Sequence, residues 1–460
     1  MARVFLVNPP SPEPVRTPLL SFCYLASALR AAGHDVALYD ASAPFADPDH
    51  AAIRARVAAF APDLVGVHLK TLHIQPAYAL AAALADFTLV AGGPHATIVP
   101  AEPLAHGFRY VIRGEGEHAL VELANGEPLA AIGGLAWIER GMLRANPERP
   151  FIADLDALAP PLAALDLFDP AWYGATTRQL PAGILSSRGC PAACTFCSND
   201  VTGRKFRYRS PDDVVAEIAE AGLVAFSFFD DSFAVGRRRV HALADAIARL
   251  PTRVYWTCTA HPAHLDRDVL ADMARAGCSG VDIGMESADP DMLLRIGKGV
   301  TVERVLDVLG WARELGIHTV VNLMFGWPDE TDAELASTIA FMERAKDLAG
   351  GFNARGVVVP YPGTQLYDAT HERFGFTGWW IREPPLRYVP FPTSWDEAEI
   401  WRAYADDPAL DRNFFRHPPE RLARIRDALT AKAELTAAIQ RRRFAGVAAC
   451  AQGVPAAGAR

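Results

Sequence analysis

The chain has 460 residues, half of them hydrophobic and 22% charged, with a formal net charge of −9. This composition is ordinary for a soluble globular protein of two or three domains, and it provides no overall basic field for nucleic acid or an anionic membrane. Seven mostly isolated cysteines, no signal peptide and no long apolar run predict a reduced, cytoplasmic protein with no membrane span and no nucleic acid partner.

Residues 1–140 alternate short apolar runs with helical stretches. We predict strands at 3–10, 35–40, 64–69, 87–93 and 110–117, with helices at 18–33, 52–62 and 77–86. Strands separated by helices imply right-handed crossovers and a mainly parallel, doubly wound sheet. Ligands of such sheets bind beyond the carboxyl ends of the strands. Those ends are residues 8–10, Asp40, 70–71, 91–95 and 113–117.

A second alternating series follows a proline- and aspartate-rich stretch, residues 141–180, which we predict to be a surface linker. The second series has strands at 183–188, 225–230, 254–259, 281–286, 318–326 and 352–360. Six strand–helix units are too few for a closed eight-stranded barrel, so residues 181–370 predict an open, partial barrel with its chemistry at the carboxyl ends of the strands. Residues 371–460 predict a smaller, mainly helical region. The fold class is therefore α/β.

Three cysteines, Cys190, Cys194 and Cys197, directly follow the first strand of the partial barrel. Thiolates suit zinc, copper(I) or iron–sulfur clusters. A structural zinc site requires a fourth Cys or His at paired spacing, and the nearby sequence has none. A [4Fe–4S] cluster held by three cysteines leaves one iron open to a substrate or cofactor. We therefore favour a cluster, with zinc or incidental thiols as the alternatives.

The spacing Cys-x3-Cys-x2-Cys, with Phe196 before the last cysteine, resembles the signature of radical S-adenosylmethionine enzymes. The resemblance implies that S-adenosylmethionine chelates the open iron and is cleaved to a 5'-deoxyadenosyl radical, with electrons from an external flavodoxin- or ferredoxin-type reductant. Segments at later strand ends also match the family. The implied S-adenosylmethionine contacts are Phe196, Asp230, Asp231, Glu286, Ser287 and Asn322. The plain alternatives are a solvated turn for the aspartates and a buried, arginine-paired carboxylate for Glu286.

The N-terminal region, residues 1–140, resembles the cobalamin-binding domain of one large subgroup of that family. The matching segments are residues 6–10, 18–40, 62–69, 89–97 and 111–117. The implied cobalamin contacts are Leu69, Thr71, Gly92, Gly93, Pro94, Gly114, Glu115 and Gly116. Cobalamin domains that ligate cobalt from the protein use Asp-x-His-x-x-Gly, whereas Asp40 is followed here by Ser42 in place of the histidine. We therefore expect no histidine on the lower face of cobalt, and we expect His95 to be a turn residue.

The resemblance covers residues 1–370 and implies methylation of an unactivated carbon, or of phosphorus, in a small-molecule, natural-product or lipid substrate through methylcobalamin. Radical oxidative cyclisation or rearrangement is the alternative within the enzyme class. A non-catalytic, metal-stabilised cobalamin sensor is the alternative from another class. The basic clusters at 203–209, 237–239 and 441–443 predict solvated faces rather than a nucleic acid site. The aromatic segments at 378–380 and 395–401 predict packing in the core or in a lid over the site.

Overall fold

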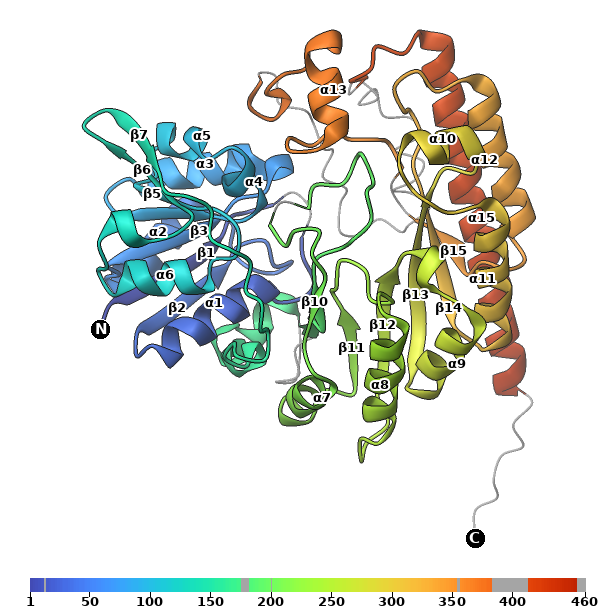
Figure 1. The fold of residues 1–460 in the computed structure, drawn as a ribbon, viewed down its shortest axis with the longest axis horizontal. Helices are drawn as coiled ribbons and strands as arrows, with labels where there is room; N and C mark the ends of the chain where they lie inside the picture. The colour runs from blue at the N-terminus through green and yellow to red at the C-terminus, as the bar shows by residue number, and fades with distance from the viewer. Residues whose placement is uncertain (12–13, 175–181, 200, 354–355, 383–412, 453–460) are drawn as a thin grey trace.

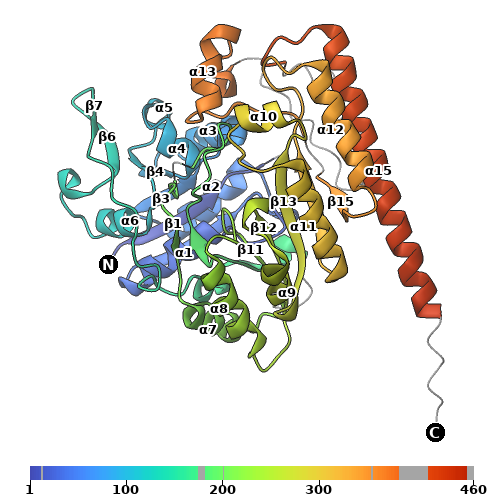
Figure 2. The ribbon, with the colours of Figure 1, turned by 45° about the vertical axis from the view of Figure 1, so that its right-hand side comes forward.

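The computed structural model describes residues 1–11, 14–174, 182–199, 201–353, 356–382 and 413–452, with side chains up to 442. Two α/β units lie next to each other, and a long C-terminal helix runs along the far side of the second unit (Figures 1 and 2). The predicted α/β fold class is confirmed. The aromatic segment at 395–401 lies outside the described residues. No helix in the described part of the chain is long and apolar enough to cross a bilayer.

The N-terminal unit is a seven-stranded sheet in the order β2-β1-β3-β4-β5-β6-β7, and its first five strands are parallel. Its strands are β1 (Arg3–Asn8), β2 (Asp35–Asp40), β3 (Leu64–His68), β4 (Leu89–Gly92), β5 (Tyr110–Ile112), β6 (Leu135–Glu139) and β7 (Met142–Ala145). Its helices are α1 (Leu20–Ala31), α2 (His50–Phe60), α3 (Ile74–Ala83), α4 (Pro94–Ile98), α5 (Ala101–Ala105) and α6 (Glu117–Ala124).

The antiparallel hairpin β6–β7 was not predicted, and it extends the sheet to Ala145, into the stretch assigned to the linker. Arg140 and Gly141 form its two-residue turn, and both have positive φ, at 50° and 76°. Such a turn matches the twist of antiparallel strands. Every residue of β7 is exposed, so the strand carries no apolar alternation that a sequence pattern could reveal.

The second unit is a six-stranded, wholly parallel sheet in the order β15-β14-β13-β12-β11-β8, which confirms the predicted partial barrel. Its strands are β8 (Ala182–Ile184), β11 (Ala225–Phe228), β12 (Tyr255–Ala260), β13 (Cys278–Glu286), β14 (His318–Leu323) and β15 (Gly351–Phe352), and a separate pair is β9 (Ser187–Arg188) with β10 (Arg207–Tyr208). The helices are α7 (Pro211–Glu220), α8 (Arg237–Ala248), α9 (Arg267–Arg275), α10 (Pro290–Arg295), α11 (Val302–Glu314), α12 (Asp332–Ala345), α13 (Gln365–Phe374) and α15 (Pro419–Gln452).

Local sequence signals fix the helices that surround this sheet. Ser210 caps α7 by accepting a hydrogen bond from the Asp213 amide at 3.2 Å, as its position before Pro211 predicts. Thr331 and Glu334 form a full capping box at the start of α12. Because α12 starts only after Thr331, the preceding residues Pro328, Asp329 and Glu330 lie in a loop.

Candidate functional site

The three predicted metal ligands lie on a loop at the tip of the β9–β10 hairpin. Arg188 pairs with Arg207 in this hairpin, so residues 189–206 form one closed loop. Gly189 has a φ of +87°, and a Cβ there would lie 2.4 Å from the Lys205 carbonyl oxygen. Only glycine therefore allows the two ends of the loop to approach so closely. Strand pairing at its base thus fixes the path of the loop.

The thiols are neighbours within this loop. Cys194 is 7% exposed, and burial raises the pKa of its thiol. The charge of Lys298 lowers this pKa, whereas the charges of Glu286 and Cys190 raise it further. Desolvation raises the pKa of Cys197 to about 11, and the negative charges of the Cys194 and Cys190 thiolates add to this rise. The Cys197 residue is nevertheless exposed. Within the described ranges no three His, Cys, Asp or Glu side chains converge closely enough to hold a single metal ion. The three thiols therefore lie near one another without converging on one point, as ligands that each bind a different iron of a cluster would.

Asp230 and Asp231, predicted to contact S-adenosylmethionine, both bind the hairpin. The Asp230 carboxylate accepts hydrogen bonds from the Ser186 amide at 2.7 Å and the Ser187 hydroxyl at 2.6 Å, and it is buried beside Arg239. Asp231 accepts from the Gly189 amide at 2.8 Å and the Thr202 hydroxyl at 2.9 Å, one donor from each end of the loop. In this structure their carboxylates therefore position the loop that carries the cysteines.

Glu286 lies inside the partial barrel beside that loop. Its φ of +73° is unusual for a residue other than glycine, and its carboxylate pairs with Lys298 at 3.1 Å. A Cβ on Gly284 would lie 2.7 Å from the Glu286 carboxylate, so this glycine provides the space for the ion pair. Burial raises the pKa of Glu286, and the two nearby ammonium groups oppose the rise. The partner of the buried carboxylate is thus a lysine rather than the arginine of the plain alternative.

The other predicted S-adenosylmethionine contacts divide into two groups. Asn322 pairs with Gly284 in the sheet, and paired residues of parallel strands face the same side, so Asn322 faces the barrel interior. Ser287 instead lies 3.3 Å from the Thr338 hydroxyl of α12 and caps the following turn. Phe196 packs edge-on against Trp327, with ring centroids 5.4 Å apart. Ser287 and Phe196 therefore contribute to packing here.

A lysine from α15 also reaches this interior, and the sequence analysis missed it. Lys432 is fully buried, donates to the Asn353 side chain at 3.2 Å and lies 5.4 Å from the centre of the Phe325 ring. A Cβ on Gly356 would lie 2.4 Å from its ammonium nitrogen. Burial lowers the pKa of Lys432 to about 7, although the negative charge of Glu286 acts in the opposite direction. A third ionisable group thus joins Glu286 and Lys298.

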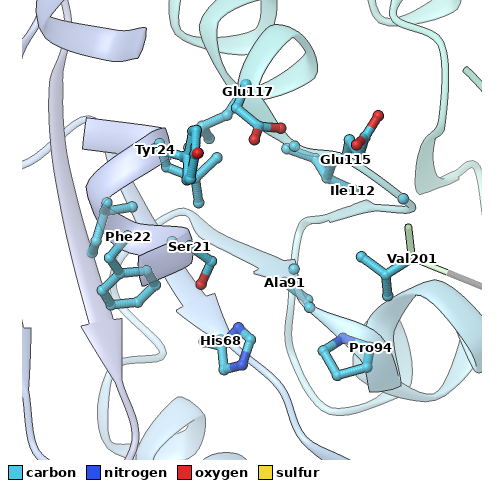
Figure 3. A pocket seen from close by; sticks show the side chains of 18 of the residues that line it. Ser21, Phe22, Tyr24, His68, Ala91, Pro94, Ile112, Glu115, Glu117 and Val201 are labelled. Atoms are coloured by element: carbon cyan, nitrogen blue, oxygen red, sulfur yellow. The ribbon is translucent and has the colours of Figure 1, made fainter. Parts of the chain in front are cut away.

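The N-terminal unit contains a mostly apolar cavity of about 210 Å³ at the carboxyl ends of its strands (Figure 3). Gly92, Gly93 and Pro94, which we predicted to contact cobalamin, line it together with the half-buried His68. Burial and then Lys70 lower the pKa of His68 to about 3, so its imidazole is neutral at physiological pH. Residues of the second unit complete the wall. These are Leu185 and Arg188, which precede the cysteine loop, and Val201 and Thr202, which belong to it.

The predicted Gly114–Glu115–Gly116 segment also lines this cavity, but the Glu115 carboxylate binds the second unit. It accepts from Arg188 at 2.9 Å and from Arg207 at 2.8 and 2.9 Å, and all three side chains are almost fully buried. Glu117 adds a second contact to Arg188 at 2.6 Å. One carboxylate of the N-terminal unit thus binds both strands of the cysteine hairpin.

Two other predicted cobalamin contacts lie differently. Leu69 is fully buried in the hydrophobic core and is absent from the cavity wall. The residues that follow it in the loop after β3, from Lys70 to His73, line a different cavity. Thr71 lies 3.1 Å from His95, whose other ring nitrogen lies 3.0 Å from Glu102. His95 is therefore a buried structural histidine. Asp40 likewise accepts from Asn8 at 2.7 Å and from Tyr173 at 2.6 Å within the protein.

Two further cavities are lined by residues of both units and by residues of the cysteine loop. One is bounded by Lys70, Thr71 and Pro94 of the N-terminal unit and by Ser198 and Tyr361 of the second. The other has a volume of about 690 Å³ and reaches Cys197, with Gly114 on the opposite wall. The cysteine loop therefore faces the carboxyl edge of the N-terminal sheet across open space.

The aromatic segment at 378–380 fastens the C-terminal region to the N-terminal unit. The Trp380 indole donates to Glu102 at 2.9 Å, and Gln75 donates to the Trp380 carbonyl oxygen at 3.2 Å. Trp379 is 3% exposed and donates to the Pro360 carbonyl oxygen at 2.9 Å. These tryptophans therefore pack, as predicted, and they bridge the two units on the side where α13 lies (Figure 1).

Two protein-family models match the chain in the units just described. The radical SAM superfamily model matches residues 184–342, and the B12 binding domain model matches residues 15–124. A curated relative, an uncharacterized methyltransferase of Pyrococcus horikoshii, is 32% identical over 388 residues, covering 80% of this chain and 82% of the relative.

Other relatives are named for different activities. An anaerobic magnesium-protoporphyrin IX monomethyl ester cyclase of Cereibacter sphaeroides is 26% identical, covering 76% of this chain and 60% of the relative. Among solved structures, the radical S-adenosylmethionine methyltransferase TsrM of Kitasatospora setae, with cobalamin and a [4Fe–4S] cluster bound, aligns with a TM-score of 0.66. The two sequences are 22% identical, and the alignment covers 87% of this chain and 84% of the TsrM chain. This structural likeness shows a common fold.

Proposed function

Because this chain belongs to the cobalamin-dependent branch of the radical S-adenosylmethionine superfamily, we propose that it is a methyltransferase. Its cofactors are a [4Fe–4S] cluster, S-adenosylmethionine and cobalamin. The substrate is a small molecule, natural product or lipid that is methylated at an unactivated carbon or at phosphorus. A flavodoxin- or ferredoxin-type protein serves as the external one-electron reductant.

The residues present fit these groups. When bound, the cluster supplies an electron for cleaving S-adenosylmethionine, and cobalamin carries the methyl group. Cys190, Cys194 and Cys197 would hold the cluster, since the donor set offers three thiols. Glu286, buried beside that loop, would accept hydrogen bonds from the ribose hydroxyls or the amino group of S-adenosylmethionine.

The cobalamin residues fit as well. Gly92 borders the cavity with nothing within 4 Å of a Cβ built on it, which leaves space for a bulky group to approach the backbone. At about 210 Å³ the cavity is below the usual range of about 300–1,000 Å³ for whole small-molecule sites. It would therefore take an apolar part of cobalamin, such as its benzimidazole base, and the wider space between the units would take the rest.

One observation supports the proposal most directly. The cysteine loop and the strand ends of the N-terminal unit face each other, and residues flanking the loop form part of the cavity wall. Methyl transfer from one cofactor to a substrate activated by the other requires both cofactors to reach one enclosed space.

Anaerobic reconstitution with iron, sulfide and cobalamin tests the proposal. With a strong reductant and S-adenosylmethionine, we expect 5'-deoxyadenosine to form. Protein that takes up cobalamin and a cluster but yields none would instead support the non-catalytic sensor.

A radical cyclase is the second candidate, because a curated cyclase is among the relatives. The two activities differ in the fate of S-adenosylmethionine. A methyltransferase uses one molecule as the methyl donor and one as the radical source, and so forms S-adenosylhomocysteine and 5'-deoxyadenosine in equal amounts. A cyclase forms only 5'-deoxyadenosine. Label from the methyl group of S-adenosylmethionine should therefore appear in the product only if the enzyme is a methyltransferase.

Two adjacent glycines separate a folding role from a cofactor role. Gly93 has a φ of +98°, and a Cβ there would lie 2.9 Å from the Leu69 carbonyl oxygen, so we expect Gly93→Ala to destabilise the protein by more than about 1–2 kcal/mol. Gly92→Ala meets no protein atom, so its apoprotein should unfold within about 0.5 kcal/mol of wild type.

Gly92→Ala should, however, weaken cobalamin binding. If Gly92 borders bound cobalamin, its added methyl group overpacks the site at a cost of about 1–3 kcal/mol, which weakens binding by roughly five- to 150-fold. Denaturant unfolding of the apoproteins and absorption titration with cobalamin measure the two effects. Unchanged cobalamin affinity in Gly92→Ala would contradict the predicted contact.

A further inference from the structure

Glu115 connects the cavity of the N-terminal unit to both strands of the cysteine hairpin. Its two carboxylate oxygens accept from Arg188, which immediately precedes Gly189, and from Arg207, which follows the loop. The Ile152 amide donates to the same carboxylate at 2.6 Å. Because Arg188 and Arg207 are paired residues of the hairpin, the Glu115 side chain bonds both strands at the base of the cysteine loop, in addition to the strand pairing itself.

This contact is buried rather than peripheral. The side chains of Glu115, Arg188 and Arg207 are 4%, 6% and 3% exposed. Arg188 also lies 4.6 Å from the centre of the Tyr24 ring, and Arg207 donates to the Ile152 carbonyl oxygen at 2.7 Å. Charges buried in this way are costly unless the hydrogen-bonded geometry is kept, so the network tolerates few arrangements. A shift of Glu115 must therefore move the arginines or break their bonds.

The same network forms part of the cavity wall. Glu115, Glu117 and Arg188 line the cavity, as do Val201 and Thr202 near the end of the cysteine loop. Figure 3 shows Glu115 and Glu117 above the cavity, with Val201 facing Pro94 and Ala91. Thr202 also donates to Asp231, the residue that holds the Gly189 amide. A group that fills the cavity thus contacts residues that fix the loop at both ends.

We propose that Glu115 is a positioning residue that couples occupancy of the cavity to closure of the cysteine hairpin. Resting on the proposed function, this means that cobalamin binding stabilises the cluster loop and that a bound cluster strengthens cobalamin binding. Linkage requires the two effects on affinity to be equal, and coupling between sites is typically about 5- to 150-fold. A simple interdomain salt bridge would stabilise the protein without making either affinity depend on the other site.

The test compares cobalamin affinity in cluster-loaded and cluster-free wild-type protein by anaerobic absorption titration. We expect the loaded form to bind at least about fivefold more tightly. In parallel, release of iron from the loaded protein to a chelator is followed with and without hydroxocobalamin, which should slow the release because bound cobalamin stabilises the loop that holds the cluster. Equal affinities, or iron release that bound cobalamin leaves unchanged, would overturn the proposal.

Glu115→Gln should remove most of this coupling. The amide keeps the shape of the side chain but cannot accept from both arginines as a charged group. The ratio of cobalamin affinities with and without the cluster, and the ratio of iron-release rates with and without cobalamin, should therefore both fall toward one. Glu117→Gln touches only Arg188 and should have a smaller effect. Glu139 is an exposed residue of the β6–β7 hairpin that pairs with Arg144. The control variant Glu139→Gln should therefore show the same two ratios as the wild-type protein.

The outcomes separate the inference from the proposed function. A wild-type protein that never binds cobalamin removes the proposed function itself. Cobalamin binding with full coupling in Glu115→Gln overturns only the role of Glu115. If that variant fails to fold, the two wild-type ratios still decide whether the sites are coupled.

Discussion

Replacing Cys194 by alanine is expected to abolish the iron–sulfur cluster. Cys194 is the most buried of the three thiols, and the segment that carries it packs on both sides. The Thr195 amide donates to the Ile296 carbonyl oxygen at 3.0 Å, and the Leu366 amide donates to the Thr195 carbonyl oxygen at 2.9 Å. A solvent ligand could replace a thiolate only weakly in such a site. We expect iron and sulfide content to fall to background.

Visible absorption after anaerobic reconstitution and 5'-deoxyadenosine formation measure this loss. Cys258→Ala is the matched control, because Cys258 is an equally buried thiol on β12 outside the loop. It should cost about 1 kcal/mol of stability and keep the cluster. A Cys194→Ala protein that retains cluster absorption and cleaves S-adenosylmethionine would show that the ligand assignment is wrong.

The sequence predicts the chemistry of this protein better than the partners of its side chains. Spacing alone brings three thiols onto one loop, and alternation of apolar runs gives both parallel sheets. It cannot show which donors a carboxylate finds in three dimensions. Asp230 and Asp231 were correctly placed at a strand end, but their partners come from the hairpin, 29 to 44 positions away in the chain. Contacts between residues so far apart in the chain produce no periodic pattern in the sequence.

Glu115 illustrates the same limit. Its Gly-Glu-Gly context after a strand indicates a tight turn at a ligand edge, and the segment does line the cavity. The arginines that bind it, Arg188 and Arg207, are 73 and 92 positions away, and Arg207 belongs to the 203–209 cluster that the sequence analysis assigned to a solvated face. Arg207 and Arg209 of that cluster are in fact 5% exposed, because carboxylates from other elements surround them. Net charge and helical spacing do not reveal such partners.

Lys432 was predictable in principle. The buried residues Ile425, Ala428, Leu429, Thr436 and Ile439 recur at helical spacing along α15. Lys432 falls on that stripe, three residues after Leu429 and four before Thr436. A charged residue on an otherwise apolar stripe is a signal that its side chain meets a partner inside. The Thr436 hydroxyl accepts from the Phe352 amide at 3.1 Å, which fastens α15 to the edge strand β15.

Lys432→Met is expected to change how stability depends on pH. Burial lowers the folded-state pKa of Lys432 to about 7, below the unfolded value of about 10.4. Between these two values the unfolded chain binds more protons, so the free energy of unfolding rises with pH. The penalty of burying the ammonium is therefore full below pH 7 and is relieved as pH approaches 10.4. From pH 7 to 9 the wild-type protein should gain about 2 kcal/mol relative to the variant.

The difference between the two proteins isolates this lysine, because Glu286 and Lys298 remain in both. Methionine has a similar length and shape without the charge, so the packing of α15 against the barrel should be kept. Urea unfolding of both proteins at pH 7, 8 and 9 gives the slopes. Lys346→Met is the control, since that lysine forms only an exposed pair with Glu343 and should leave the wild-type slope unchanged. Parallel curves for wild type and Lys432→Met would mean that Lys432 stays charged in the folded protein, held by Glu286 and Asn353 strongly enough to offset its burial.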